Sequence, residues 1–271
     1  MKKALAYLVL ILGAVSMALP FGLMLVTSLM TNAQAMAYPP RLWPDPIAWE
    51  NYAKALTATP LWRYFLNSVL VSSVTVLGQV VTGAMAAYAF ARLRFKGRDA
   101  LFLVFLATMM VPPQVNVVPL FGLMCRLGWV NTYWALIVPG LFGAFGVFLL
   151  RQWFLSFPAE LEEAAKLDGC TPWGTFWRIA FPTAVPAIAT LAIFAFITSW
   201  NSFFWPLIVT NSDALRTLPV GLAAYRASFR EITDWGTLMA ATTLAILPAI
   251  GVFLAGQRYF IQGMLAGSLK D

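Results

Sequence analysis

Residues 64–91 read YFLNSVLVSSVTVLGQVVTGAMAAYAFA and contain no Asp, Glu, Lys or Arg. A helix needs about 20 mostly apolar residues to cross the hydrocarbon of a membrane, and this run exceeds that length. Five other uncharged stretches do the same: residues 4–40, 100–125, 127–150, 179–212 and 235–257. The sequence therefore predicts an all-α transmembrane protein with six spans, near residues 5–29, 66–90, 101–122, 133–150, 184–209 and 237–257.

The overall composition requires a lipid solvent. Hydrophobic residues make up 61% of the chain and charged residues only 11%, against roughly 25% charged residues in soluble domains. A chain of 271 residues cannot bury so much apolar surface in a water-soluble core. No shift in composition marks a soluble appendage, so residues 1–271 are predicted to form a single transmembrane domain.

The charges and reactive residues exclude several function classes. The net charge of +7 comes from short clusters between apolar runs, which cannot form the continuous basic face that a nucleic-acid partner needs. The chain has no histidine, the commonest general base and metal ligand, and we predict no catalytic and no metal site. Cys125 and Cys170 fall on opposite sides of the predicted membrane and are interpreted as inert thiols.

The N-terminus resembles a secretory signal, with Lys2 and Lys3 before an apolar run and a possible cleavage site at residues 33–35. The uncharged stretch, however, is much longer than the roughly 7–15-residue core of a signal peptide. An uncleaved first span is the preferred interpretation.

The basic residues predict the orientation. The connection after the second span packs together Arg92, Arg94, Lys96 and Arg98, and such clusters mark the cytoplasmic side. Both termini, the 92–99 loop and the 151–180 loop are therefore placed in the cytoplasm. The outer loop 36–62, rich in Pro and Trp, is predicted to form an ordered cap at the membrane surface, and residues 210–235 a polar outer hairpin.

Prolines interrupt several of the predicted spans. They are Pro112-Pro113 in the third, Pro139-Gly140 in the fourth, Pro206 in the fifth and Pro248 in the sixth. A backbone carbonyl freed in lipid must find another partner or face a watery cavity, so broken helices point to a transport path. Ordinary kinks in membrane helices are the alternative.

The stretch SFPAELEEAAKLDG at residues 156–169 predicts a short surface helix. Pro158 and early acids suit its first turn, Glu162 can pair with Lys166, and Gly169 can end it. Thr171 and Pro172 then predict the start of a second helix, which runs toward residue 182. One side of the first helix would carry Leu161, Ala164, Ala165 and Asp168. A shallow docking surface and a solvated amphipathic loop helix are both open interpretations.

This stretch resembles the cytoplasmic signature of binding-protein-dependent ABC importer permeases. Residues 163–165 read EAA, Gly169 follows after three residues, and residues 179–182 read IAFP after nine more. The family pattern has Leu where this chain has Phe181. The segments similar to the carbohydrate branch are WENY at 49–52, AYA at 87–89, WN at 200–201, WPL at 205–207 and LPVGL at 218–222.

The resemblance implies a six-helix, type I ABC importer permease fold with a cytoplasmic coupling helix, in a bacterial or archaeal cytoplasmic membrane. It also implies that the 151–182 loop couples the chain to an ATPase. The coupling residues would be Glu163, Ala164, Ala165, Lys166, Asp168 and Gly169. No Gly-x-x-x-x-Gly-Lys-Ser/Thr motif occurs, so ATP and Mg²⁺ would bind to a partner ATPase and this chain would need no cofactor. The implied partners are that ATPase dimer, a second homologous permease, and a soluble or lipid-anchored sugar-binding protein.

A carbohydrate substrate is implied in the same way. Aromatic faces and hydrogen-bonding groups suit sugars, so the candidate path residues are Gln114, Asn116, Trp200, Asn201, Ser202 and Trp205. The candidate contacts to the binding protein are Tyr225, Arg230, Asp234 and Trp235. Two rivals are a stand-alone secondary carrier, which would need charged groups that the span cores lack, and a membrane enzyme, which would need a catalytic set.

Overall fold

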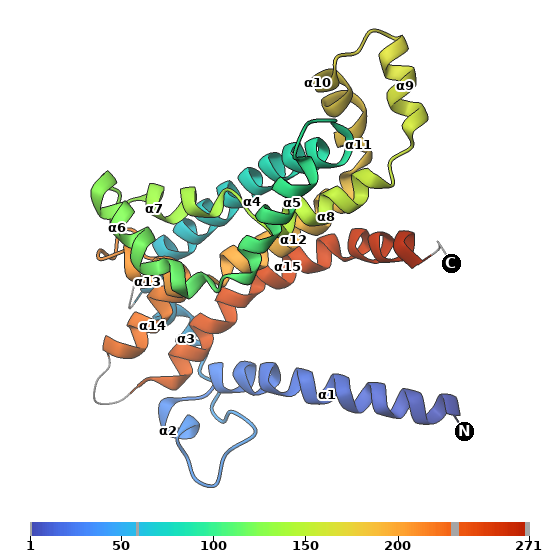
Figure 1. The fold of residues 1–271 in the computed structure, drawn as a ribbon. Coiled ribbons are helices and arrows are strands. Elements are labelled where there is room, and N and C mark those ends of the chain that lie inside the picture. Colours follow the sequence, from blue (N-terminus) through green and yellow to red (C-terminus); the bar gives the residue numbers. More distant parts are fainter. Residues whose placement is uncertain (1, 58–59, 229–232, 269–271) are drawn as a thin grey trace. The chain divides into compact units, whose positions relative to one another are not determined.

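The computed structural model describes residues 2–57, 60–228 and 233–268, with side chains described for 3–57, 60–225 and 233–259. Every regular element in this part of the chain is a helix (Figure 1). The chain divides into two compact units, one of Met1–Leu66 with Arg216–Pro248 and one of Asn67–Leu215 with Ala249–Asp271. Each unit is described by itself.

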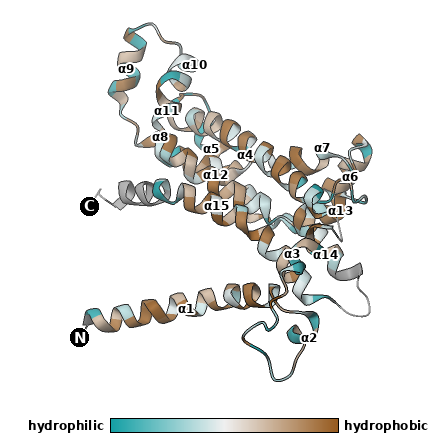
Figure 2. Ribbon diagram, turned by 180° about the vertical axis from the view of Figure 1, so that it is seen from behind, coloured by the Kyte–Doolittle hydropathy of each residue, from teal (hydrophilic) through white to brown (hydrophobic). Residues whose placement is uncertain are grey.

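The predicted spans correspond to long apolar helices. Four stretches of helix are long and apolar enough to cross a membrane: Lys3–Ser28, Leu61–Arg92, Tyr133–Leu155 and Trp235–Tyr259. Two bent pairs also qualify, Arg98–Met110 with Pro113–Leu127 and Pro172–Thr183 with Val185–Trp200. If each bent pair is one span, the total is the six that the sequence predicts. Hydrophobic residues run along α1 (Lys2–Ser28), whereas α9 (Ala159–Leu167) carries hydrophilic ones (Figure 2).

The first unit contains α1, α2 (Asn32–Ala35), α3 (Glu50–Thr57), the start of α4 (Leu61–Arg92), α14 (Leu218–Ser228) and most of α15 (Trp235–Ser268). In its 29–57 segment, side chains bond backbone carbonyls, while the predicted cap over 36–62 includes residues 58–59, which lie outside the described residues. Asn51 donates hydrogen bonds of 2.9 and 2.8 Å to the carbonyls of Ser28 and Met30. A Cβ at Gly236 would lie 2.4 Å from the Met30 carbonyl oxygen, so only glycine allows α15 to approach this closely.

The second unit contains the rest of α4 and the elements from residue 98 to residue 209. They are α5 (Arg98–Ala107), α6 (Val117–Leu127), α7 (Tyr133–Ile137), α8 (Ala144–Leu155), α9, α10 (Pro172–Thr175), α11 (Phe181–Thr183), α12 (Val185–Trp200) and α13 (Phe204–Val209). Short 3₁₀ turns cover Thr108–Met110, Pro113–Asn116 and Val138–Gly140, and a π-helical turn covers Phe176–Ala180.

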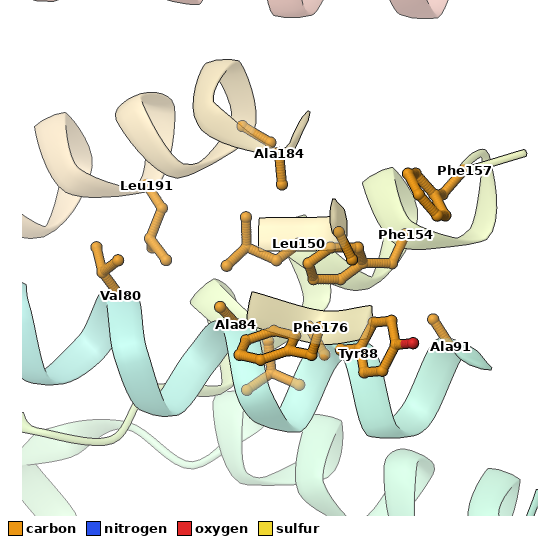
Figure 3. Close-up of a cluster of buried hydrophobic side chains, with 14 of the residues drawn as sticks. Val80, Ala84, Tyr88, Ala91, Leu150, Phe154, Phe157, Phe176, Ala184 and Leu191 are labelled. Carbon is orange, nitrogen blue, oxygen red and sulfur yellow. The ribbon is translucent and has the colours of Figure 1, made fainter. Parts of the chain in front are cut away.

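The core of this unit gathers where α4, α8 and α12 meet (Figure 3). Small residues on α4, such as Ala84, let the neighbouring backbones approach. Tyr88 packs its ring on Phe154 and Phe176, with centroids 5.5 and 5.2 Å away. This cluster fixes the last turns of α4 against the segment that leads into and out of α9.

The interruptions predicted at Pro112-Pro113 and Pro139 are present, whereas Pro248 lies inside the continuous helix α15 and does not break it. At Pro112-Pro113 the third predicted span bends by 91° between its two halves. Pro139 lies in the 3₁₀ turn Val138–Gly140 between α7 and α8.

The fifth predicted span, 184–209, is not one continuous helix. α12 ends at Trp200, residues 201–203 are not helical, and α13 begins at Phe204. Pro206 lies in the first turn of α13, where its missing N–H costs no hydrogen bond, and it cannot bond the carbonyl of Ser202. The break is therefore built into the sequence.

Candidate functional site

The helix α9 begins and ends as its sequence predicts. Pro158 immediately precedes it, and Glu160 and Glu162 lie in its first turn, where acids favour the helix dipole. Gly169 has φ +77°, and the N–H of Cys170 donates a 2.9 Å hydrogen bond to the carbonyl of Ala165. These features are typical of a helix that ends with one residue in the left-handed backbone conformation, which glycine adopts most easily.

The helix that follows also starts as predicted. The Thr171 hydroxyl accepts a 3.2 Å hydrogen bond from the N–H of Gly174, and Pro172 is the first residue of α10. Figure 1 shows α9 and α10 as neighbouring helices at one end of their unit, with α6, α7 and α13 at the other.

The two faces of α9 differ from the faces predicted from the sequence. Ala165 is only 2% exposed, and the Glu162 side chain is 12% exposed, so both point into the chain. The outward face consists of Glu160, Glu163, Ala164 and Leu167, all exposed. We call these four residues the α9 outer face. Ala164 therefore lies on the outward side and Ala165 on the inward side, since adjacent residues on a helix point in directions about 100° apart.

Glu162 pairs with Arg92, not with Lys166 as predicted. Arg92 Nε lies 2.8 Å from Glu162 Oε1, and Arg92 Nη2 lies 3.0 Å from Glu162 Oε2. Beside this ion pair is a cleft of about 650 Å³, whose lining includes Tyr88, Arg94, Glu163 and Lys166. The predicted coupling residues thus divide into exposed ones (Glu163, Ala164, Lys166, Asp168 and Gly169) and the buried Ala165.

The candidate path residues lie at two separate breaks in the second unit. Gln114 and Asn116 are exposed in the 3₁₀ turn that follows Pro112. Asn201 is exposed and Ser202 half-buried between α12 and α13. These four polar side chains are placed where solvent or a solute could reach them.

The two tryptophans among the candidate path residues are packed instead. Trp200 is 3% exposed and stacks on Phe196, with ring centroids 5.4 Å apart. The Trp205 indole Nε1–H donates a 2.8 Å hydrogen bond to the carbonyl of Ala135. Trp205 also packs with residues of α6 and α7, such as Leu120 and Leu136.

The candidate contacts to a binding protein lie in the first unit. Tyr225 is 5% exposed, and burial raises the pKa of its hydroxyl above the usual value of 10.0. Asp234 accepts a 2.7 Å hydrogen bond from the Thr237 hydroxyl at the start of α15, and Trp235 is half-buried. Arg230 lies outside the described residues.

Sequence reasoning missed three features of this region. The Arg92–Glu162 pair joins residues 70 positions apart, and no local sequence pattern predicts such a pair. Leu167 is 90% exposed; it could have been found as the position seven residues after Glu160, on the same helix face. The polar side chains of α4 that face the helix break at Pro139, such as Gln79 and Thr82, could have been found by their helical spacing.

Comparison with known proteins identifies the family. Residues 79–266 match the family of the binding-protein-dependent transport system inner membrane component. A relative from Halalkalibacterium halodurans, the arabinooligosaccharides transport system permease protein AraQ, is 38% identical over 90% of this chain and 86% of its own. The sn-glycerol-3-phosphate transport system permease protein UgpE of Brucella abortus is 33% identical over 97% of this chain and 96% of its own.

The fold agrees with this assignment. A solved structure of a bacterial ABC transporter involved in the import of the acidic polysaccharide alginate superposes with a TM-score of 0.85, at 23% identity, over 96% of both chains. The resemblance found in the sequence is thus confirmed. Members of this family are membrane permeases that bind no cofactor themselves. The chain therefore belongs to the family of binding-protein-dependent ABC transporter inner-membrane components and is a multi-pass permease subunit of such an importer.

Proposed function

We propose that this permease imports a carbohydrate or a polyol derivative, delivered by a sugar-binding protein. The relatives named for arabino-oligosaccharides and for sn-glycerol-3-phosphate support this substrate class. The exposed amide groups of Gln114, Asn116 and Asn201 at the two helix breaks suit hydroxyl-rich solutes. We propose that Trp200 and Trp205 do not contact the substrate but stabilise the helices beside these breaks, because both rings are packed against other residues.

The second part of the proposal concerns α9, which would dock on a separate ATPase subunit and couple it to the membrane helices. The α9 outer face supports this role because it is exposed. It combines the small side chain of Ala164 with the apolar Leu167 and the acidic Glu160 and Glu163. Exposed apolar side chains that lie together on one surface are a feature of protein–protein interaction sites. This surface is the single observation that carries the proposal.

The orientation and the remaining partners follow from the same proposal. Residues 1–271 would form one transmembrane permease domain with both termini in the cytoplasm, so that α9 faces the ATPase dimer. A second homologous permease would complete the pore. Tyr225, Asp234, Trp235 and the neighbouring Arg230 would lie on the outer side, where the binding protein delivers its ligand.

Co-purification tests the proposal. The tagged chain, extracted from its own membranes, is expected to bring down an ATPase and a second permease, and ATP-dependent uptake of labelled arabinotriose or glycerol-3-phosphate is expected only with all subunits. Gly169→Val should abolish uptake while the chain remains inserted, because valine cannot easily adopt φ +77°. Gly97→Val is the matched control, since Gly97 has φ +80° in another exposed loop. Uptake by the chain alone would favour a secondary carrier.

A further inference from the structure

The contact between α4 and α9 depends on one ion pair with a fixed geometry. Arg92 is the last residue of α4, and its guanidinium binds both carboxylate oxygens of Glu162, at 2.8 and 3.0 Å. A bidentate pair of this kind fixes the relative orientation of the two groups as well as their separation. Its side chains are only 16% and 12% exposed, so solvent screens the attraction little.

Further contacts hold the two charged groups in place. The Arg92 guanidinium carbon lies 6.0 Å from the centre of the Phe157 ring, just before α9. Tyr88 lies one turn earlier on α4 and lines the same cleft as Arg92 and Glu162. Figure 3 shows Tyr88, Ala91 and Phe157 at the same end of the buried cluster. The ion pair is thus seated in packed surroundings on the α4 side.

On the α9 side, the inward-facing residues are Glu162 and Ala165. Ala165 contributes only a methyl group, which gives little resistance to sliding or rotation. The directional restraint between α9 and α4 therefore comes mainly from Glu162, while α9 also contacts α10. Lys96 and Arg94, in the loop after α4, are exposed, and Arg94 lines the cleft beside this contact.

Beyond Arg92, α4 is a continuous helix from Leu61 to Arg92, about 48 Å long at 1.5 Å per residue. At its middle, Gln79 and Thr82 hydrogen-bond the carbonyls of Gly140 and Leu141 in the broken span. A displacement of the cytoplasmic end of α4 would therefore reach a helix break far from α9.

We propose that Arg92 and Glu162 form a rigid joint that makes α9 and α4 move as one body when the ATPase moves α9. This inference rests on the proposed docking of α9 and deepens it. Arg92 and Glu162 are positioning residues: they touch neither the substrate nor the nucleotide, and they convert a push on the α9 outer face into a displacement of α4.

A spin-label distance measurement tests the joint in the assembled transporter. Leu161→Cys on α9 and Leu77→Cys on α4 are exposed positions, and labels are attached after Cys125 and Cys170 are replaced by serine. Distances are recorded without nucleotide and after trapping with Mg-ATP and vanadate. The chain with native Arg92 and Glu162 should give one narrow distribution that is the same in both states, because α9 and α4 move together.

Substitutions of Arg92 and Glu162 then distinguish a loss of the ion pair from a general loss of stability. Arg92→Glu and Glu162→Arg should each at least double the width of the distribution, and the double charge swap should return it close to the original width. Arg92→Lys, which keeps the charge but loses the bidentate geometry, should lie between. Lys96→Glu, a charge reversal in the adjacent loop, should leave the width unchanged.

Three results would overturn the inference alone: single variants with the original width, a double swap as broad as the single variants, or a distribution that shifts on trapping in the chain with native Arg92 and Glu162. By contrast, absence of the ATPase from the purified complex would overturn the proposed function, and the joint with it. Thermal unfolding of each variant identifies chains that are simply misfolded, and the double swap keeps the comparison decisive if one single variant does not fold.

Discussion

The side-chain amide of Gln79 donates a 2.8 Å hydrogen bond to the carbonyl of Gly140, from the middle of one membrane helix to the break in another. One turn later, the Thr82 hydroxyl donates to the carbonyl of Leu141 at 2.8 Å. The 3₁₀ turn around Pro139 ends at Gly140 and α8 begins only at Ala144, so the Gly140 and Leu141 carbonyls lie in a break between helices, where lipid offers no replacement donor. α4 therefore supplies the polar groups that make the break between α7 and α8 tolerable in a membrane.

Gln79→Leu should destabilise the chain, because the Gly140 carbonyl would lose its donor. We expect a loss of about 1 kcal/mol, the usual size of such bonds between membrane helices, measured by denaturant unfolding in detergent. Gln152→Leu is the matched control, since Gln152 is exposed on α8 and its replacement should change stability by less than about 0.5 kcal/mol. Equal effects of both substitutions would contradict the role assigned to Gln79.

Gly236→Ala should disrupt the packing of α15 on the 29–57 segment. The new methyl group would lie 2.4 Å from the Met30 carbonyl oxygen and 2.6 Å from the Asn51 amide nitrogen, so the backbone must shift at a cost of about 1–3 kcal/mol. Gly251→Ala, on the same helix with no heavy atom within 4 Å, should be neutral or stabilising because alanine favours the helix. The midpoint of thermal unfolding should therefore fall for Gly236→Ala and stay the same or rise for Gly251→Ala. Equal midpoints for the two variants would contradict the close contact between Gly236 and the 29–57 segment.

Trp205→Phe should lower stability by about 1 kcal/mol through loss of the indole hydrogen bond to Ala135, and it should leave substrate preference unchanged. Competition between labelled arabinotriose and unlabelled sugars measures the preference, and chemical unfolding measures the stability. Trp43→Phe, at an exposed tryptophan, should change neither. A changed substrate preference with unchanged stability would instead indicate that Trp205 contacts the substrate.

The helices and their breaks were predictable from the sequence because their signals are local. Charge-free runs predicted the long helices, and Pro112-Pro113 predicted the bend. Pro158 and Gly169 predicted the two ends of α9, and Thr171 predicted the start of α10. These signals depend only on membrane thickness and on the dihedral limits of proline and glycine.

The contacts between distant segments could not be predicted in the same way. Glu162 has a suitable partner four residues away in Lys166, yet it binds Arg92, because the tertiary fold brings a planar guanidinium with two donors to its inward side. The role of Trp205 depended on the position of the Ala135 carbonyl, and that of Gly236 on Met30 and Asn51. Such relationships arise from the packing of separate helices and leave no periodicity in the chain.

The most direct test of the account is photo-cross-linking from Leu167, the most exposed apolar residue of α9. A photoreactive amino acid placed there, in membranes that contain the whole transporter, should yield one main adduct with the ATPase subunit, and Mg-ATP with vanadate should change its yield. A matched photoreactive residue at Leu103, exposed on α5, should give no such adduct. If Leu167 cross-links to lipid or to an outer binding protein, and never to the ATPase, then α9 does not couple nucleotide hydrolysis to transport.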